Sequence, residues 1–387
     1  MKKNIAILGS TGSIGNNLLK IVKKNPKDFN IILLSANKNY KKLITQAKKF
    51  HAKNLIISDE NAYRKALIQL ENNKKIKLYR DFKSFKKIFP KKIDYVMSSI
   101  MGLSGLVPTI GIIKYTNKIA IANKESLICG WKLIRSELNR YKTEFIPVDS
   151  EHFSVWFGLK GHNIASVEKI YLTASGGPFL NLPLKNFKKI KLNQALKHPN
   201  WKMGKKISID SATLTNKLLE LIEARNIFNI QLNKFSIIIH PDSYVHCIIK
   251  FKNGLTKLIL HETDMRIPIE NSIYNSLNKI SNNHLNLKKL NNLKLHKVNT
   301  LRYPIIKLLK NIPNHHSLFD TVIVCCNEIV VKAFIEKLIR FNEISKLMLK
   351  IVSNKEFDQL KYSLPSSIND ILKINNRVKN LLHNYIS

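Results

Sequence analysis

The stretch Asn4-Ile5-Ala6-Ile7-Leu8-Gly9-Ser10-Thr11-Gly12-Ser13-Ile14-Gly15 decides the fold of this chain. Its apolar beginning is typical of a strand buried in a parallel sheet, and a helical pattern of apolar residues starts at Asn16. The glycines between them let the backbone approach a pyrophosphate, which the helix N-terminus then faces. A tight turn that packs a helix on a strand is the alternative. We expect a dinucleotide-binding strand–turn–helix unit.

Strands and helices alternate through the rest of the N-terminal part. Apolar runs predict strands at residues 31–34, 54–58, 95–99, 118–122 and 145–148, and helices at 62–70 and 106–113. This alternation predicts an α/β fold with a Rossmann-like, doubly wound parallel sheet. The strand at 31–34 is followed by Asn37, Lys38 and Asn39 rather than by the acid that holds a ribose 2′-hydroxyl. The lysine favours the 2′-phosphate of NADP instead.

The composition is that of a globular chain with a strong positive charge. Its 387 residues suffice for two or three domains, and 44% of them are hydrophobic. A net charge of +39 suits a nucleic-acid binder. The lysines are, however, spread along the whole chain rather than gathered in one patch. We therefore expect a surface that attracts anionic substrates, and no nucleic-acid partner.

Signals for a membrane or for disulfides are weak. No apolar run approaches the ~20 residues that span a bilayer, and the short apolar run near the N-terminus leads directly into the glycine motif. We expect a cytoplasmic protein with no membrane partner. The cysteines form no C-x-x-C pair, which predicts buried, reduced thiols; they are Cys129, Cys247, Cys325 and Cys326.

Two acids follow the apolar run 145–148, in the stretch Pro147-Val148-Asp149-Ser150-Glu151-His152. If this stretch is extended, Asp149 and Glu151 point to the same side, because side chains alternate along a strand. Two carboxylates held that close repel each other unless a cation, a proton or a basic partner lies between them. Oxygen ligands of this kind suit Mg²⁺ or Mn²⁺. A solvated surface loop is the alternative.

Other polar residues stand where such a site would need them. Lys124 follows the strand at 118–122, at the sheet edge where ligands bind, although a plain salt bridge is the alternative. The turn Ser175-Gly176-Gly177-Pro178 can wrap an anion with backbone N–H groups. The loop 198–204 contains an imidazole, an indole and a thioether, which favours a loop that covers a bound ligand. Packing of these side chains onto the core is the alternative.

A helix is predicted to start near residue 210, capped by Asp210 or Ser211, and to end at about residue 225. Three polar residues share one face of it: Asn216, Lys217 and Glu220. Ser211 at the helix N-terminus and Lys217 would form a phosphate cradle. Glu220 would be the third carboxylate of the metal site. An ordinary solvated helix face is the alternative.

The second half of the chain has a different pattern of apolar residues from the first. Apolar segments at 236–240, 244–251 and 255–260 predict antiparallel strands that could support self-association, and helical periodicity dominates from residue 301, most clearly at 327–341. We expect four regions: an NADPH-binding Rossmann-like domain at 1–150, an α+β catalytic and dimerisation domain at 151–280, a linker at 281–300, and a C-terminal helical domain at 301–387.

Six motifs in order carry a resemblance to a known family. They begin at Gly9, Ala122, Val148, Ala174, His198 and Asp210, and the last is followed by Asn216, Lys217 and Glu220. Together they resemble 1-deoxy-D-xylulose 5-phosphate reductoisomerase, from the N-terminus to about residue 335. The resemblance implies an NADP-dependent oxidoreductase of the non-mevalonate isoprenoid pathway. It would rearrange and reduce 1-deoxy-D-xylulose 5-phosphate to 2-C-methyl-D-erythritol 4-phosphate, with NADPH and Mn²⁺ or Mg²⁺ (Co²⁺ as an alternative), as a V-shaped homodimer.

The resemblance also implies roles for individual residues. The metal ligands would be Asp149, Glu151 and Glu220. The catalytic residues would be Lys124, Glu151 and His198. The substrate would be bound by Lys124, Ser150, Glu151, Ser175, His198, Ser211, Asn216, Lys217 and Glu220. The cofactor would be bound by Thr11, Gly12, Ser13, Ile14, Asn37, Lys38, Asn39, Asn123, Glu125 and Gly204.

The chain departs from the family pattern in four places. Asn37 and Leu218 stand where the family has glycine, and the stretches 260–266 and 324–328 differ from their usual Leu-Gly-x-Pro-Asp-Met-Arg and Asn-Ala-Ala-Asn-Glu. None of these changes removes a metal or phosphate group. The sequence does not choose between a retro-aldol and an α-ketol rearrangement. A metal-free NADP dehydrogenase and a basic nucleic-acid-binding protein are the alternative functions.

Overall fold

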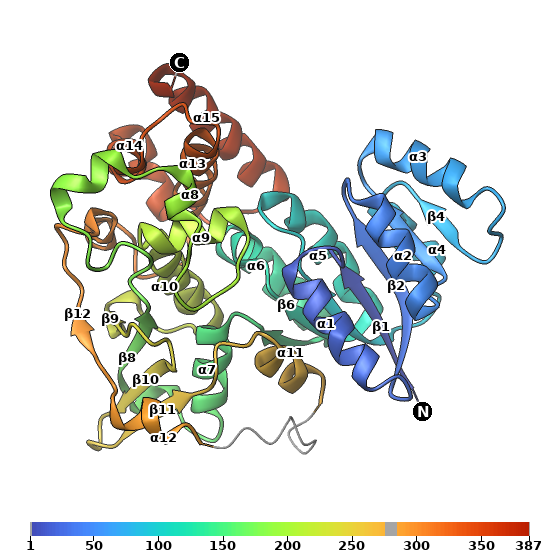
Figure 1. The fold of residues 1–387 in the computed structure, drawn as a ribbon, viewed down its shortest axis with the longest axis horizontal. Coiled ribbons are helices and arrows are strands. Elements are labelled where there is room, and N and C mark those ends of the chain that lie inside the picture. Colours follow the sequence, from blue (N-terminus) through green and yellow to red (C-terminus); the bar gives the residue numbers. More distant parts are fainter. Residues whose placement is uncertain (1, 275–284, 387) are drawn as a thin grey trace. The chain divides into compact units, whose positions relative to one another are not determined.

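The computed structural model describes residues 2–274 and 285–386, which form two compact units (Figure 1). The first unit holds the N-terminal region to Ser126, residues 133–149 and helix α11 (Arg266–Ile273). The second holds residues 127–132, residues 150–264 and the C-terminal part of the chain. The predicted boundary between residues 280 and 281 lies outside the described residues.

The first unit is built on one parallel sheet of seven strands, in the order β4-β3-β2-β1-β5-β6-β7. In that order the strands are β4 (Lys77–Tyr79), β3 (Asn54–Ile57), β2 (Phe29–Ala36), β1 (Lys3–Leu8), β5 (Ile93–Ser98), β6 (Thr116–Ile121) and β7 (Glu144–Pro147). Chain order runs outward from β1 in both directions, so the doubly wound prediction is confirmed. The switch point lies between β1 and β5, where ligands bind in folds of this class.

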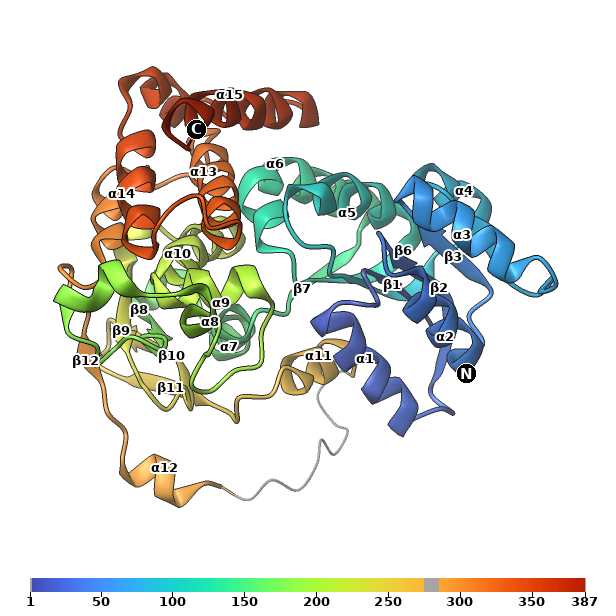
Figure 2. The ribbon, with the colours of Figure 1, turned by 45° about the horizontal axis from the view of Figure 1, so that its top comes forward.

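Helices cover both faces of this sheet. They are α1 (Ser13–Lys24), α2 (Tyr40–Phe50), α3 (Glu60–Leu70), α4 (Phe85–Ile88), α5 (Leu106–Ile112) and α6 (Lys124–Tyr141). Figure 2 shows α1 and α2 on one face and α5 and α6 on the other. Residues 266–273 fall within the region 151–280 that was predicted as one domain, but in the structure they form α11 and pack in the first unit. Ile269 and Ile273 join its core, and Ser272 Oγ lies 2.7 Å from Tyr95 Oη.

The glycine motif occupies the turn between β1 and α1, as predicted. Gly9 has a φ of 82°, and a Cβ atom at this position would lie 2.8 Å from the carbonyl oxygen of Ser99. A side chain would therefore be strained both by the backbone conformation and by the close approach of a neighbouring chain segment. The turn delivers the chain to α1 at Ser13, three residues before the predicted start of the helix.

The second unit contains a mixed sheet in the order β11-β10-β8-β9-β12. Its strands are β11 (Thr256–Leu260), β10 (Val245–Phe251), β8 (Val167–Ala174), β9 (Phe235–Ile239) and β12 (His296–Lys297). The prediction of antiparallel strands holds for β10 with β11, but β9 pairs with β8 in parallel. The long helical connection between β8 and β9 explains the difference, because parallel neighbours need a crossover.

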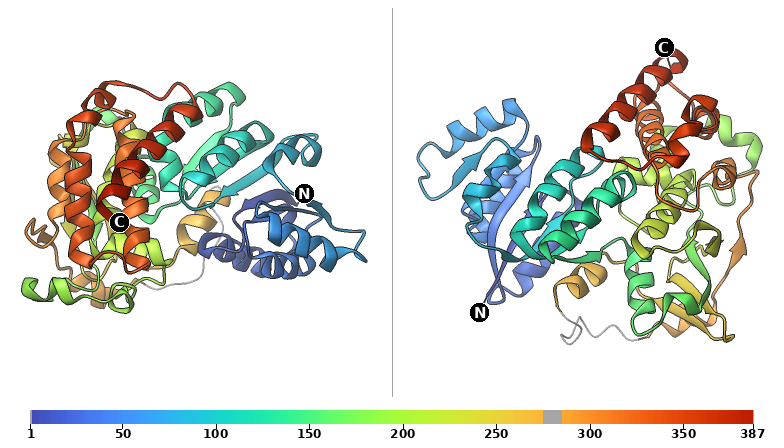
Figure 3. Two further views of the ribbon diagram at one scale, coloured as in Figure 1. Left: turned by 90° about the horizontal axis from the view of Figure 1, so that it is seen from above. Right: turned by 180° about the vertical axis from the view of Figure 1, so that it is seen from behind.

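Two helices cover this sheet, and further helices continue the unit. Helix α7 (Ser150–Leu159) contacts β10 and β11, and α10 (Thr215–Phe228) contacts α7, β8 and β9. The others are α8 (Leu192–Ala195), α9 (Lys205–Ala212), α12 (Leu287–Asn291), α13 (Phe319–Ile335), α14 (Phe341–Val352) and α15 (Ile368–Ile386). Helices α13, α14 and α15, orange to red in Figure 3, pack together and confirm a helical C-terminal region.

Helix α13 begins eight residues before the predicted start at 327 and ends at Ile335 instead of residue 341. Its buried face runs from Phe319 to Phe334, and Lys337 then adopts a φ of 64°, which ends the helix. Among residues 2–274 and 285–386, no helix combines the length and the apolar character needed to cross a membrane.

Candidate active site

The two acids after β7 do not lie in an extended loop. Helix α7 begins at Ser150, so Glu151 belongs to its first turn and Asp149 directly precedes it. The argument from alternating strand side chains is therefore wrong. The first turn of a helix is instead a favourable place for a carboxylate, because the backbone N–H groups there carry partial positive charge. Ser150 Oγ donates a hydrogen bond to Glu151 Oε2.

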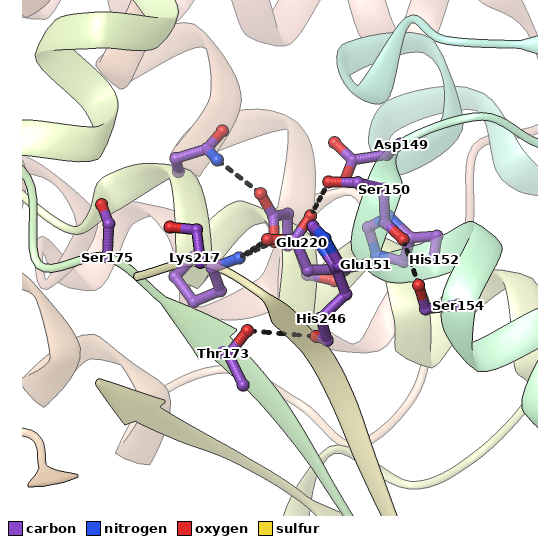
Figure 4. A network of polar contacts seen from close by, with 12 residues as sticks. Asp149, Ser150, Glu151, His152, Ser154, Thr173, Ser175, Lys217, Glu220 and His246 are labelled. Carbon is purple, nitrogen blue, oxygen red and sulfur yellow. Dashed lines mark hydrogen bonds and ion pairs between the residues drawn. The ribbon is translucent and has the colours of Figure 1, made fainter. Parts of the chain in front are cut away.

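Glu151 faces Lys217 and Glu220 of helix α10 (Figure 4). Lys217 Nζ lies 2.6 Å from Glu151 Oε1 and 2.5 Å from Glu220 Oε2. Lys217 and Glu220 are 4% and 1% exposed, which rules out an ordinary solvated helix face. Asn216 Nδ2 donates to Glu220 Oε1. The predicted set Asn216, Lys217 and Glu220 is thus one polar cluster, in which Lys217 and Glu220 are buried and Asn216 is partly buried.

The charges of this cluster depend on one another. Burial alone would lower the pKa of the Lys217 ammonium, but the carboxylates of Glu151 and Glu220 outweigh burial and raise it. The lysine therefore stays protonated and acts as the counter-charge that lets two carboxylates approach in a buried place. Their oxygens lie within 4.8 Å of each other, and all-oxygen donors at that spacing fit a hard divalent cation.

Asp149, the third predicted ligand, is the last residue of the first unit's segment 133–149 and directly precedes α7. It is two residues before Glu151 in the chain, and its Oδ2 lies 3.2 Å from Lys124 Nζ, at the start of α6. Lys124 is 6% exposed. The salt-bridge alternative for Lys124 is therefore present in the structure, and its partner is one of the predicted metal ligands.

A buried histidine–carboxylate pair lies behind this cluster and was missed in the sequence. His152, fully buried, places Nε2 2.9 Å from the carbonyl oxygen of Glu220 and Nδ1 3.5 Å from Glu223 Oε2. His152 thus ties the residue after Glu151 to the backbone of α10. The spacing of three between Glu220 and Glu223 was the available signal for a second inward-facing acid.

The small-residue turn after β8 presents Ser175 in a defined hydrogen-bonding state. The backbone N–H groups of Asn200 and Trp201 donate to His198 Nδ1, at 3.1 and 2.9 Å. The neutral ring therefore carries its proton on Nε2, which lies 3.0 Å from Ser175 Oγ. Gly177 N–H donates to the same oxygen, at 3.0 Å. With two donors at its oxygen, Ser175 directs its own proton to a further acceptor.

His198 remains neutral at physiological pH. Burial lowers its pKa to about 4, a shift that Lys217 reinforces and the charge of Glu151 opposes. Because Nδ1 accepts from the loop and Nε2 donates to Ser175, both ring nitrogens are engaged. The geometry places His198 where it can position Ser175, and a catalytic role for His198 stays a prediction.

The predicted helix start near residue 210 is wrong. Asp210 and Ser211 lie in the last turn of α9, and α10 begins separately at Thr215. Leu214 between them has a φ of 65°, which breaks the helix without the glycine that would signal it. Ser211 therefore does not cap the helix of Lys217, whose first turn instead holds Asn216 and Lys217 themselves. Asp210, buried, binds Lys206 and Asn327 instead.

The loop 198–204 lies between α8 and α9, and Gly204 precedes the first turn of α9. Trp201 is half-buried and meets the ring of His246 edge-on at 6.2 Å. His246 in turn stacks on His261 at 3.6 Å, so the departure from the family pattern at position 261 fills this place with a second imidazole. A lid function for the loop stays a prediction.

The other departures are accommodated by packing. Leu218 lies fully buried in α10, and Val324, Cys325 and Cys326 are fully buried in α13. All four cysteines of the chain are buried, free thiols, as predicted.

In the first unit, the predicted cofactor residues gather after β1 and β2. Thr11 to Ile14 form the glycine turn and the start of α1, and Asn39 caps α2 by accepting from Lys42 N–H. Asn37 Nδ2 lies 2.9 Å from Ser58 Oγ, and Lys38 is exposed. Lys42, which sequence reasoning missed, places Nζ 2.9 Å from the carbonyl oxygen of Thr11. The ammonium group of Lys42 thus lies beside the glycine turn.

Two further predicted residues lie after β6. Asn123 caps α6 through its side chain, which accepts from Ser126 N–H at 2.8 Å, and Glu125 is buried in the first turn. The remaining predicted cofactor residue, Gly204, belongs to the second unit.

The fold and the site define a class of α/β enzyme. A Rossmann-like sheet with a nucleotide-type glycine turn is joined to a separate unit that buries an acid–lysine cluster beside a serine–glycine anion turn. Three family models match the chain: 1-deoxy-D-xylulose 5-phosphate reductoisomerase over residues 5–130, its C-terminal domain over 145–228, and the DXP reductoisomerase C-terminal domain over 260–381. The chain belongs to the 1-deoxy-D-xylulose 5-phosphate reductoisomerase family.

Individual relatives agree with this assignment over the full length. The reductoisomerase of Pelagibacter ubique is 52% identical over 379 residues, covering 97% of each chain. That of Wolbachia pipientis from Culex pipiens is 37% identical, covering 96% of this chain and 94% of its own. A structure of the Zymomonas mobilis enzyme in complex with NADPH has a TM-score of 0.87 at 31% identity, with complete coverage of both chains. A DOX-P reductoisomerase in complex with NADPH, fosmidomycin and magnesium has a TM-score of 0.91 at 28% identity, covering 99% and 98%.

Proposed function

We propose that this chain is an NADP-dependent oxidoreductase of the non-mevalonate isoprenoid pathway. It converts 1-deoxy-D-xylulose 5-phosphate to 2-C-methyl-D-erythritol 4-phosphate, using NADPH and a divalent metal. The observation that carries this proposal is the buried cluster in which Lys217 joins Glu151 and Glu220. A metal-free dehydrogenase has no use for two carboxylates, one of them fully shielded, held together around a buried lysine.

The metal would be held by Asp149, Glu151 and Glu220. Their donor chemistry supports this assignment, because all three offer carboxylate oxygens and the two in the second unit already share one cation, Lys217. When bound, Mn²⁺ or Mg²⁺ supplies Lewis-acid polarisation of neighbouring substrate oxygens and fixes their orientation. Co²⁺ prefers similar ligands and is the alternative.

The remaining residues of the site bind and orient the sugar phosphate. The phosphate would be held by Ser175, Ser211, Asn216 and Lys217, and this remote binding energy orients the reacting carbons. Ser175 suits the role because its oxygen already accepts two hydrogen bonds, which leaves its proton for an acceptor-only phosphate oxygen. His198 keeps Ser175 in that state, and Ser150 holds Glu151.

Two residues are placed to manage charge and protons during the rearrangement. Lys124, whose ammonium is buried beside Asp149, would neutralise negative charge that develops on a substrate oxygen. Glu151 would move a hydroxyl proton, since its carboxylate is held by Ser150 and Lys217.

The nucleotide would lie along the carboxyl end of the first sheet. Thr11, Gly12, Ser13 and Ile14 would approach its pyrophosphate, and Asn37, Lys38 and Asn39 its adenosine 2′-phosphate. Asn123, Glu125 and Gly204 would complete the cofactor contacts. When bound, NADPH supplies the hydride that reduces the rearranged carbonyl compound.

We further propose that the enzyme acts as a cytoplasmic homodimer. The outer strand β11 supports self-association through the second sheet, because Leu255 and Leu258 at this edge are 67% and 37% exposed.

The test is NADPH oxidation by the purified protein with 1-deoxy-D-xylulose 5-phosphate, before and after chelation and with Mn²⁺ restored. We expect activity that requires the metal and a branched product that keeps its phosphate, identified by ¹³C and ³¹P NMR. Activity that survives exhaustive chelation, or an unbranched product, would favour a metal-free dehydrogenase. Salt-sensitive nucleic-acid binding without NADPH oxidation would favour the nucleic-acid alternative.

A further inference from the structure

A tyrosine distant in the sequence forms a hydrogen bond with the turn that follows Ser175. Tyr303, 1% exposed, places its hydroxyl 2.7 Å from the carbonyl oxygen of Gly176. The carbonyl oxygen of Gly176 and the N–H of Gly177 belong to one peptide unit and point in opposite directions. Tyr303 therefore holds one end of the unit whose other end donates to Ser175 Oγ, at 3.0 Å.

The backbone conformation of this peptide unit is one that depends on glycine. Gly176 and Gly177 have φ values of 83° and 66°, and glycine can rotate out of such a conformation at small cost. A flip of the unit would turn the Gly177 N–H away from Ser175 and present a carbonyl oxygen to an incoming anion. The neighbouring Arg302 secures the chain after the turn, since its Nη1 donates to the carbonyl oxygens of Phe179 and Leu182.

Tyr303 is suited to act as a permanent donor. Burial raises its pKa to about 12, so the hydroxyl keeps its proton over the working pH range. Hydrogen bonds in a series polarise one another in a buried setting. Donation from Tyr303 to the Gly176 carbonyl thus strengthens donation from the Gly177 N–H to Ser175, and in turn from Ser175 to an acceptor beyond it.

We propose that Tyr303 is a positioning residue for substrate phosphate, acting through the Gly176–Gly177 peptide on Ser175. The inference rests on the proposed function for the identity of the substrate, but it concerns a phosphate-recognising turn that can be tested with inorganic phosphate alone. Tyr303 itself touches the turn from the protein side and is not a catalytic residue.

The test compares Tyr303→Phe with Tyr95→Phe, a matched control that also removes one buried tyrosine hydroxyl, hydrogen-bonded to Ser272 in the first unit. The first readout is the rise in melting temperature that inorganic phosphate produces, and the second is KM and kcat with 1-deoxy-D-xylulose 5-phosphate at saturating NADPH. We expect Tyr303→Phe to weaken phosphate binding and raise KM about tenfold, the effect of one buried hydrogen bond, with kcat changed less than about twofold. The control should match the wild type in both.

A double-mutant comparison distinguishes an effect of Tyr303 that acts through Ser175 from a general loss of rigidity in the protein. In a Ser175→Ala background we expect Tyr303→Phe to have little further effect on KM, because both changes break the same chain of hydrogen bonds. Equal phosphate responses and equal KM values in the two tyrosine variants would overturn the inference, as would an undiminished effect in the Ser175→Ala background. A wild type that responds to phosphate but does not oxidise NADPH would overturn the proposed function instead.

The effect of Tyr303→Phe on folding is checked by its thermal melt. Tyr303→Phe removes one oxygen and no carbon, so a cooperative melt is expected. If the variant does not fold, 3-fluorotyrosine placed at position 303 keeps the hydroxyl and makes it a stronger donor. It should bind inorganic phosphate at least as well as the wild type, and weaker binding would contradict the proposal.

Discussion

Lys217 Nζ lies 2.6 Å from Glu151 Oε1, and this contact joins a residue proposed to bind the phosphate to a residue proposed to bind the metal. The same ammonium lies 2.5 Å from Glu220 Oε2, so a buried lysine stands between a buried and a partly buried carboxylate. A divalent cation bound to these carboxylates would take over their neutralisation. Lys217 would then be available to the substrate phosphate, which couples the two halves of the site electrostatically.

The first prediction tests this coupling with Lys217→Met. Removing the ammonium leaves the buried carboxylate of Glu220 facing the partly buried one of Glu151 without a counter-charge, which we expect to destabilise the metal-free protein by about 3 kcal/mol. Mn²⁺ should then raise the melting temperature more in the variant than in the wild type, because it restores the missing counter-charge. A smaller Mn²⁺ response in Lys217→Met, measured by differential scanning fluorimetry, would contradict the coupling.

The second prediction concerns the cofactor. Lys38 is exposed directly after β2, where an acid would select NAD, so NADPH should be preferred over NADH. Lys38→Ala should lower kcat/KM for NADPH about tenfold and leave that for NADH nearly unchanged. Lys41→Ala, also exposed and three residues along, is the control. Steady-state rates with both nucleotides check this, and a wild type that uses NADH equally well would refute it.

The third prediction concerns the loop 198–204. Trp201 is half-buried against His246, so its fluorescence should change when substrate and NADPH bind. Trp201→Phe should abolish that change, although Trp131 and Trp156 remain. Trp201→Ala should raise KM while the melting temperature stays within a few degrees of the wild type. Unchanged kinetics, or a collapsed fold, would assign the loop to core packing.

The fourth prediction follows from His198. Its pKa in the folded protein is about 4, below the ordinary value of about 6.5, so between these values the unfolded chain binds more protons than the folded one. Stability should therefore fall as pH drops from about 6.5 towards 4. His198→Asn keeps an acceptor for the loop N–H groups but cannot take up this proton. The melting temperature of His198→Asn should therefore fall less than that of the wild type as the pH drops over that interval. Equal falls in melting temperature for the two proteins would contradict the lowered pKa of His198.

Local patterns in the sequence predicted the first sheet well. Its strands are buried apolar runs, and the spacing of the glycines correctly placed a tight turn at Gly9. The positive φ of Gly9 and the close approach of Ser99 explain why glycine is required there. Strand β4 was missed because its three residues, Lys77–Tyr79, are exposed or half-buried and carry no apolar run. The start of α7 was missed because an apolar run before two acids resembles a strand leading into a loop.

The rest of the site depends on contacts between distant residues. Leu214 has a φ of 65° although it is not a glycine, so no local signal in the sequence separated the two helices. Tyr303 meets Gly176 across 127 positions, and His152 meets Glu220 across 68. Such pairs follow from tertiary structure and not from spacing. The chemical identity of the acids, the lysines and the serine was nevertheless readable from the motifs.

The proposal that Glu151 and Glu220, with Asp149, hold the metal is tested most directly by the Mn²⁺-induced rise in melting temperature of Glu220→Gln. The control is Glu262→Gln, which removes a carboxylate of the same unit that pairs with Lys289 at 2.5 Å. We predict that Glu220→Gln loses most of the Mn²⁺ response and most of the NADPH oxidation, whereas the control keeps both. An Mn²⁺ response in Glu220→Gln equal to that of the control, with activity retained, would contradict the metal site.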